Sequence, residues 1–77
     1  MMSCKQIFSR SLRVLMAIKG MRNTHLAKEM GVTLPTINAW TSGKAIPVAD
    51  NLDKLAKTFN VPISKLFSAE ISFKEGE

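Results

Sequence analysis

A length of 77 residues, 45% of them hydrophobic, leaves room for one folded domain and excludes a disordered or low-complexity chain. The single cysteine, Cys4, excludes an internal disulfide, and no apolar run approaches the ~18 residues that a membrane-spanning helix needs. The net charge of +5 suits a polyanionic partner, nucleic acid first and an anionic membrane surface second. Because the N-terminus also lacks the pattern of a signal peptide, we expect a cytoplasmic protein.

The first two predicted elements are helices over about residues 5–19 and 23–30, because apolar residues recur there at helical spacing. The apolar side of the first helix contains Ile7, Phe8, Leu12, Leu15 and Met16. The apolar side of the second contains Leu26, Ala27 and Met30. Gly20 and Gly31 follow these helices directly, and glycine is the residue that most readily ends a helix.

A third helix is predicted to begin after Thr33, a good N-cap, with Pro35 in its first turn, where a missing N–H is harmless. Ile37 and Trp40 lie three residues apart and form its inward pair, and residues 42–44 close it. The second and third helices are therefore joined by a tight turn, with small Ala27 where the two helices cross closely and Gly31 at the turn itself. Val32, like Ile37 and Trp40, fills the space between these helices and the rest of the core.

A fourth helix is predicted over about 49–59, with Asn60 as its stop, and residues 61–62 open a short fifth helix. The apolar residues of the two helices are Leu52, Leu55, Ala56, Phe59, Ile63, Leu66 and Phe67. In the tail, Ile71 and Phe73 alternate with polar residues, which indicates a strand or a docking arm. We expect one domain over residues 1–77, with a core over about 5–67 and a short tail over 68–77.

The segment 21–40 resembles the helix-turn-helix of the Cro/cI-type family, also called the xenobiotic-response-element family. The resemblance starts near Phe8 and covers about three quarters of the chain. It is carried by Leu26-Ala27, Gly31-Val32, Ile37, Trp40, Gly43-Lys44, Pro47, Asn51-Leu52, Leu55-Ala56, Val61 and Leu66-Phe67. It implies an all-α, five-helix, lambda-repressor-like domain whose third helix enters the major groove of double-stranded DNA. It further implies a transcriptional regulator, a repressor before an activator, that binds a palindromic operator as a homodimer.

The family's base-reading positions match Leu34, Pro35, Asn38 and Ala39, all on the side of the third helix opposite Ile37 and Trp40 or on its flank. Many relatives carry hydrogen-bonding residues at the first two positions. Leu34 and Pro35 instead either contact thymine methyl groups, as Ala39 also can, or only cap and stiffen the helix. Asn38 is the one clear polar reader and suits adenine.

Contacts to the DNA backbone are implied at the start of the second helix, around the third helix and on the first. The matching residues are Asn23, Thr24, Thr33, Thr36, Ser42, Lys44 and Arg13. Arg10, Lys19 and Arg22 add longer-range attraction, although any single cation can equally be a solvated surface charge. Many relatives pair Arg at the position of Met16 with Glu at that of Thr41, and here both partners of that pair are replaced.

The family's dimer surface corresponds to residues 60–73, where Ile63, Phe67, Ile71 and Phe73 either form the interface or complete the monomer core. The rival interpretation is an antitoxin-like or adaptor module whose main partner is a protein, favoured by the apolar surface of the third helix. A membrane-surface protein using Ile71 and Phe73 is a weaker rival. With His25 as the single histidine, we expect no enzyme activity, metal, cofactor or small-molecule substrate.

Overall fold

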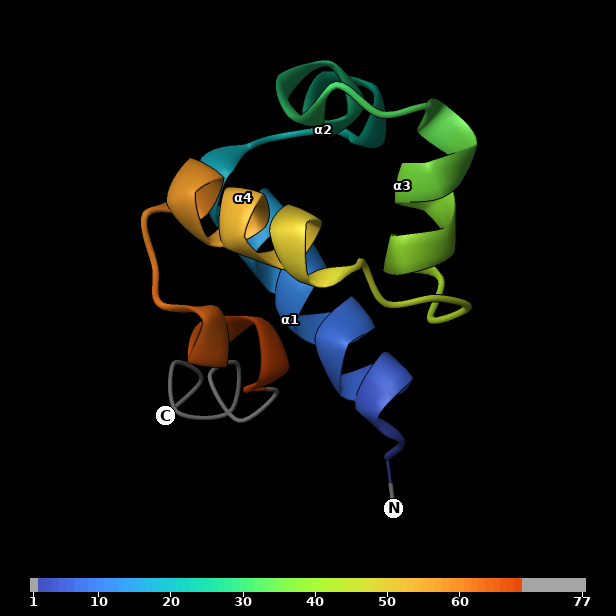
Figure 1. The fold of residues 1–77 in the computed structure, drawn as a ribbon, viewed down its shortest axis with the longest axis vertical. Helices are drawn as coiled ribbons and strands as arrows, with labels where there is room; N and C mark the ends of the chain where they lie inside the picture. The colour runs from blue at the N-terminus through green and yellow to red at the C-terminus, as the bar shows by residue number, and fades with distance from the viewer. Residues whose placement is uncertain (1, 69–77) are drawn as a thin grey trace.

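Four α-helices and one 3-10 helix make up the computed structural model, which describes residues 2–68 (Figure 1). The elements are α1 (Cys4–Lys19), α2 (Asn23–Met30), α3 (Leu34–Thr41), α4 (Ala49–Phe59) and the 3-10 helix η1 (Ile63–Phe67). No strand occurs within residues 2–68, so the prediction of an all-helical fold is confirmed for that part of the chain. The predicted strand or arm at Ile71 and Phe73 lies outside the described residues.

The ends of the helices follow from the residues that flank them. Ser3 and Gln6 form a capping box at the start of α1, in which the backbone N–H of Ser3 donates to Gln6 Oε1 at 2.8 Å and that of Gln6 donates to Ser3 Oγ at 3.2 Å. At the end of α2, Gly31 has φ +70°, a left-handed conformation that costs glycine little. Asn60 ends α4 in the same conformation, with φ +56°.

The predicted fifth α-helix is wrong in type, because residues 63–67 form a 3-10 helix. The backbone N–H of Lys65 donates to the carbonyl of Pro62 at 3.0 Å, which is a bond across three residues instead of four. A segment of five residues is too short to recover the cost of nucleating an α-helix, and short 3-10 turns are common in that situation. The domain therefore contains four α-helices and one 3-10 turn within residues 2–68.

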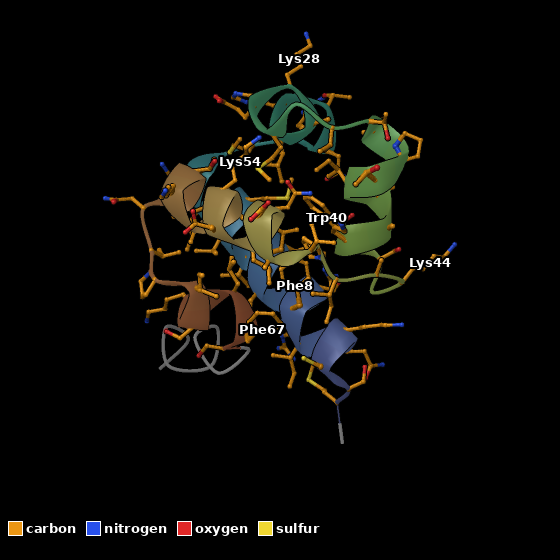
Figure 2. All side chains as sticks on the ribbon, viewed as in Figure 1. Phe8, Lys28, Trp40, Lys44, Lys54 and Phe67 are labelled. Atoms are coloured by element: carbon orange, nitrogen blue, oxygen red, sulfur yellow. The ribbon has the colours of Figure 1, made fainter. Side chains whose placement is uncertain are left out.

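One apolar core joins all five elements. Its buried residues are Phe8, Leu12, Leu15, Met16, Leu26, Ala27, Met30, Ile37, Trp40, Leu55, Ala56, Phe59 and Leu66. α1 packs against both α3 and η1, while α4 packs against α2 and η1. The rings of Phe8 and Phe67 lie 5.5 Å apart and tilted by 42°, which ties the start of α1 to the 3-10 turn (Figure 2).

The turn between α2 and α3 places α3 at one edge of the molecule, beside α1 (Figure 1). The backbone N–H of Val32 donates to the carbonyl of Ala27 at 3.1 Å, so the chain reverses tightly over Gly31. Val32 is half-buried against the core, and α3 begins two residues later. No helix within residues 2–68 is long and apolar enough to cross a membrane.

Candidate nucleic-acid interface

α3 has one buried and one exposed side, as its sequence predicts. Ile37 is fully buried and Trp40 is 3% exposed, so both anchor the helix to the core. On the opposite side, Pro35 and Asn38 are exposed, and Leu34, on the flank, is 38% exposed. Ala39, the fourth predicted base-reading residue, is half-buried and so is less exposed than the other three.

The first turn of α3 is fixed by two threonines. Thr33 Oγ1 accepts a hydrogen bond from the backbone N–H of Thr36 at 3.4 Å, and the two hydroxyl groups lie 2.9 Å apart. Pro35 lies within this turn, where it removes an N–H that has no helical partner. This turn is therefore rigid, and it holds the exposed Leu34 and Pro35 in one orientation.

A hydrogen-bonded cluster links the start of α2 to the exposed side of α3. Asn23 Nδ2 donates to Asn38 Oδ1 at 2.8 Å and to Thr41 Oγ1 at 3.2 Å. Sequence reasoning placed Asn23 on the DNA backbone and Asn38 on the bases, but it did not predict that the two side chains bind each other. The sequence gives little indication of this hydrogen bond, because it depends on how α2 and α3 cross and not on the spacing of the two residues along the chain.

At the position of the family's buried ion pair, this chain has an apolar residue and a hydroxyl group. Met16 is 5% exposed within the core. Thr41 is half-buried, and its hydroxyl donates back to the carbonyl of Ile37 at 3.1 Å while it accepts from Asn23. Each residue is thus satisfied separately, which avoids the high cost of a buried charge without its partner.

Sequence analysis missed Ser9, a buried serine on α1 that holds the end of α3. Ser9 is 3% exposed, and its hydroxyl donates to the carbonyl of Thr41 at 2.6 Å. A carbonyl in the last turn of a helix has no partner within the helix, so this bond satisfies one of them and ties α3 to α1. The feature of the sequence that could have identified Ser9 is a serine on a largely apolar face of a helix.

The N-terminus of α2 carries no side-chain cap, because Arg22 stands at the N-cap position. Its first N–H groups are therefore available to an acceptor from outside the domain, and a phosphate oxygen is a suitable one. Thr24, a predicted backbone contact, is exposed in this turn. Asn23, another predicted backbone contact, is half-buried, and its amide nitrogen donates to Asn38.

At the other end of α3, Arg13 and Ser42 border a shallow groove of about 710 Å³ between α1 and the turn that follows α3. The Nε of Arg13 donates to the carbonyl of Ser9 at 3.3 Å, which aligns the guanidinium group with the helix. Lys44 is exposed in the same turn and points away from the domain (Figure 2). These predicted backbone contacts thus flank the C-terminal end of α3.

The charge of the described part of the chain is strongly basic, since residues 2–68 hold ten of the eleven Lys and Arg residues but three of the six acidic ones. α3 itself carries no charged residue. His25 lies exposed on α2, with its Nε2 at 3.6 Å from Glu29 Oε1. Within residues 2–68, no group of three or more His, Cys, Asp and Glu side chains lies close enough to hold a metal ion.

Comparison with known proteins identifies this arrangement. The family model described as "Helix-turn-helix" matches residues 12–66. The HTH-type transcriptional activator BcrR of Enterococcus faecalis is 33% identical over 63 residues, which are 82% of this chain. The chain spans about a third, 31%, of the length of that relative. No solved structure matches significantly. Because the matched residues 12–66 include α2, its turn and α3 together with the helices that pack against them, the chain belongs to the Cro/cI-type, or xenobiotic-response-element, family of helix-turn-helix domains.

Proposed function

We propose that the protein is a transcriptional regulator that binds double-stranded DNA in a sequence-specific manner, with α3 in the major groove. The observation that carries the proposal is the exposed side of α3. Leu34, Pro35 and Asn38 face outward from a helix that Ile37 and Trp40 fix to the core. A helix at the edge of a domain, fixed in this way, suits the major groove, where apolar side chains can contact thymine methyl groups and Asn38 can bind base edges.

The surroundings of α3 suit the phosphate backbone on both sides of the groove. The uncapped N-terminus of α2, with exposed Thr24, offers N–H groups to a phosphate at one end. Arg13, Ser42 and Lys44 lie at the other end. Because phosphate contacts set the register and base contacts set the specificity, this division fits a sequence-specific DNA-binding surface.

We propose further that two copies bind a palindromic operator, with their α3 helices about one helical turn, ~34 Å, apart. One recognition helix covers only a few base pairs, so a second copy is needed for useful specificity. In the region that the family uses for dimerisation, Ile63 is 43% exposed while Phe67 is half-buried against Phe8. Ile63 is therefore the large apolar residue, among those described in this region, that is exposed to a partner copy.

The direction of regulation depends on where the operator lies. Repression requires only that the bound protein block a promoter, so repression is our proposal for an operator that overlaps one. The relative from Enterococcus faecalis is named as an activator. A reporter gene carrying the operator upstream of, or across, a promoter distinguishes the two modes. We propose the cytoplasm as the place where the protein acts.

The decisive experiment is selection of bound sequences from a random duplex library, followed by titration of the best site at several salt concentrations. Neutralising around five phosphates per dimer gives a log–log slope of affinity against salt of about −4 to −5. A slope near zero, or no enriched sequence, contradicts the proposal and favours a protein partner. Ile63→Lys tests the dimer by sedimentation and by loss of cooperative binding, with exposed Ile18→Lys on α1 as the matched control.

A further inference from the structure

The side chain of Asn38 is not free to choose its orientation, because a second carboxamide holds it. Asn23 Nδ2 donates one hydrogen to Asn38 Oδ1 at 2.8 Å and the other to Thr41 Oγ1 at 3.2 Å. Both amide hydrogens of Asn23 are thereby used. The two acceptors lie on the same helix, α3, so a single side chain of α2 fixes the end of the Asn38 side chain relative to the recognition helix.

The direction of these bonds follows from the hydroxyl of Thr41, which has one hydrogen. That hydrogen is directed at backbone carbonyls of α3, those of Ile37 at 3.1 Å and Asn38 at 3.3 Å. Thr41 Oγ1 can therefore only accept from Asn23, which requires the amide nitrogen of Asn23 on that side. With both carboxamides turned over, Thr41 would have to give up its bond to the helix. The observed arrangement makes three hydrogen bonds, two from Asn23 and one from Thr41 to the carbonyl of Ile37. The reversed arrangement makes two, because Asn38 and Thr41 would then both donate to the oxygen of Asn23.

The remaining polar group of Asn38 is its amide nitrogen, which donates to no acceptor within residues 2–68 and belongs to an exposed residue. We infer that Asn23 is a positioning residue that sets the base preference of Asn38, by holding Asn38 Oδ1 so that the amide nitrogen is offered to DNA. The inference rests on the proposed function, since it concerns the groove that α3 enters.

A hydrogen-bond donor at this point selects a particular set of bases. Guanine O6, thymine O4 and the N7 atoms of guanine and adenine are acceptors in the major groove, whereas cytosine presents only an amino donor there. A paired contact to adenine remains possible, because the bond from Asn23 uses only one lone pair of Asn38 Oδ1 and the other can accept from adenine N6. The position that Asn38 reads is therefore a base with an acceptor in the major groove, namely adenine, guanine or thymine, and not cytosine.

Replacing Asn23 by aspartate reverses the arrangement. The carboxylate of Asn23→Asp accepts from the amide nitrogen of Asn38 and from the hydroxyl of Thr41, which turns Asn38 Oδ1 outward as an acceptor. Selection from a random duplex library is then expected to shift at one position per half-site, toward cytosine, which the wild-type donor excludes, and away from guanine and thymine. The shift expected is about fivefold, the factor that corresponds to one net hydrogen bond.

Thr24→Asp is the matched control, because it adds the same charge in the same turn of α2 and Thr24 makes no hydrogen bond to Asn38. It should weaken binding to all sequences and leave the preferred base unchanged. Asn23→Ala removes the hold on Asn38 without adding charge, and it should flatten the preference at that one position. Circular dichroism and thermal melting of each free variant confirm that it is folded.

A measurement without DNA separates this inference from the proposed function. In the free protein, the side-chain amide protons of Asn23 should exchange with solvent more slowly than those of the exposed Asn60. Equal exchange rates overturn the inference even if DNA is bound. Folded Asn23→Asp and Asn23→Ala variants that select the same base as the wild type also overturn it. A wild-type protein that enriches no sequence contradicts the proposed function itself.

Discussion

Two regions of the molecule are held together by different forces. Where α1, α2 and α3 meet, the helices are joined by side-chain hydrogen bonds from Ser9 and Asn23. Around α4 and η1 the contacts are almost entirely apolar, with Leu55, Phe59 and Leu66 buried. The exception in the described residues is Lys54, whose Nζ donates to the carbonyl of Met30 at the end of α2 at 3.1 Å (Figure 2).

This difference matches what each region has to do. Apolar burial is strong but does not depend on direction, so it stabilises the domain without fixing individual side chains to a fraction of an ångström. Hydrogen bonds contribute less to stability and more to orientation. The hydrogen bonds of Ser9 and Asn23, here called the polar junction, therefore orient the exposed side of α3. The apolar region around α4 and η1 stabilises the domain and so keeps these bonds in place.

The largest expected effect comes from the apolar region. Leu66 in η1 is fully buried, and Leu66→Ala should lower the free energy of unfolding by about 2–5 kcal/mol, because it removes apolar contacts and leaves a cavity. Ile63→Ala, in the same turn but exposed, should cost less than about 0.5 kcal/mol. Urea denaturation measures both. Equal costs would mean that η1 is not part of the core.

The next largest effect concerns binding at the polar junction. Asn38→Ala should weaken binding to the preferred site by about 1–3 kcal/mol and relax selection at one position per half-site, with stability nearly unchanged because the residue is exposed. Lys44→Ala should instead weaken binding to every duplex and make the salt slope of the dimer less steep by about 2, because each of the two copies loses one phosphate contact. Affinity titrations on the selected site and on a scrambled duplex measure both. Identical behaviour of the two variants would remove the distinction between base and backbone contacts.

The comparison also explains how much could be predicted from the sequence. Helix positions depend on local signals, namely apolar spacing and stop residues such as Gly31 and Asn60, and these placed α1, α2 and α4 to within one residue. The type of η1 was wrong because α- and 3-10 helices share apolar spacing over five residues. The sequence therefore identified Leu66 as one of the apolar residues of this segment but did not predict its backbone geometry.

At the candidate site, the sequence predicted which residues share the exposed side of α3 but not which partners hold them. The buried positions of Ile37 and Trp40 follow from a helical wheel. The bond between Asn23 and Asn38 spans fifteen positions and depends on the crossing of two helices. The hydroxyl of Ser9 likewise reaches a carbonyl on another helix, 32 positions away. Contacts of this kind are set by tertiary packing, which periodicity does not describe.

A smaller effect is expected at the start of α3. Thr33→Ala removes the N-cap of the helix and should lower the free energy of unfolding by about 1 kcal/mol, because the N–H of Thr36 loses its acceptor. Thr24→Ala is the matched control, since Thr24 is exposed in a helix whose start has no side-chain cap. Thermal melting of both variants tests this. A loss of stability as large in Thr24→Ala would show that the cap itself contributes little.

The smallest changes in the free energy of unfolding are expected at two buried serines of α1. Ser9 is 3% and Ser11 2% exposed, but their hydroxyl groups differ. That of Ser9 donates to the Thr41 carbonyl at 2.6 Å, whereas that of Ser11 has no partner within the described residues. Ser9→Ala should lower the free energy of unfolding by about 1 kcal/mol, because it removes the bond that ties α3 to α1.

Ser11→Ala should have the opposite sign and raise stability by about 0.5 kcal/mol. It removes a desolvated hydroxyl that gains no hydrogen bond, and alanine is the better helix former. The small cavity left by one oxygen atom offsets part of this gain. Parallel urea denaturation of the two variants measures the difference. If both lose stability equally, the Ser11 hydroxyl is satisfied in solution, and the polar junction extends further along α1 than the bonds of Ser9 and Asn23 indicate.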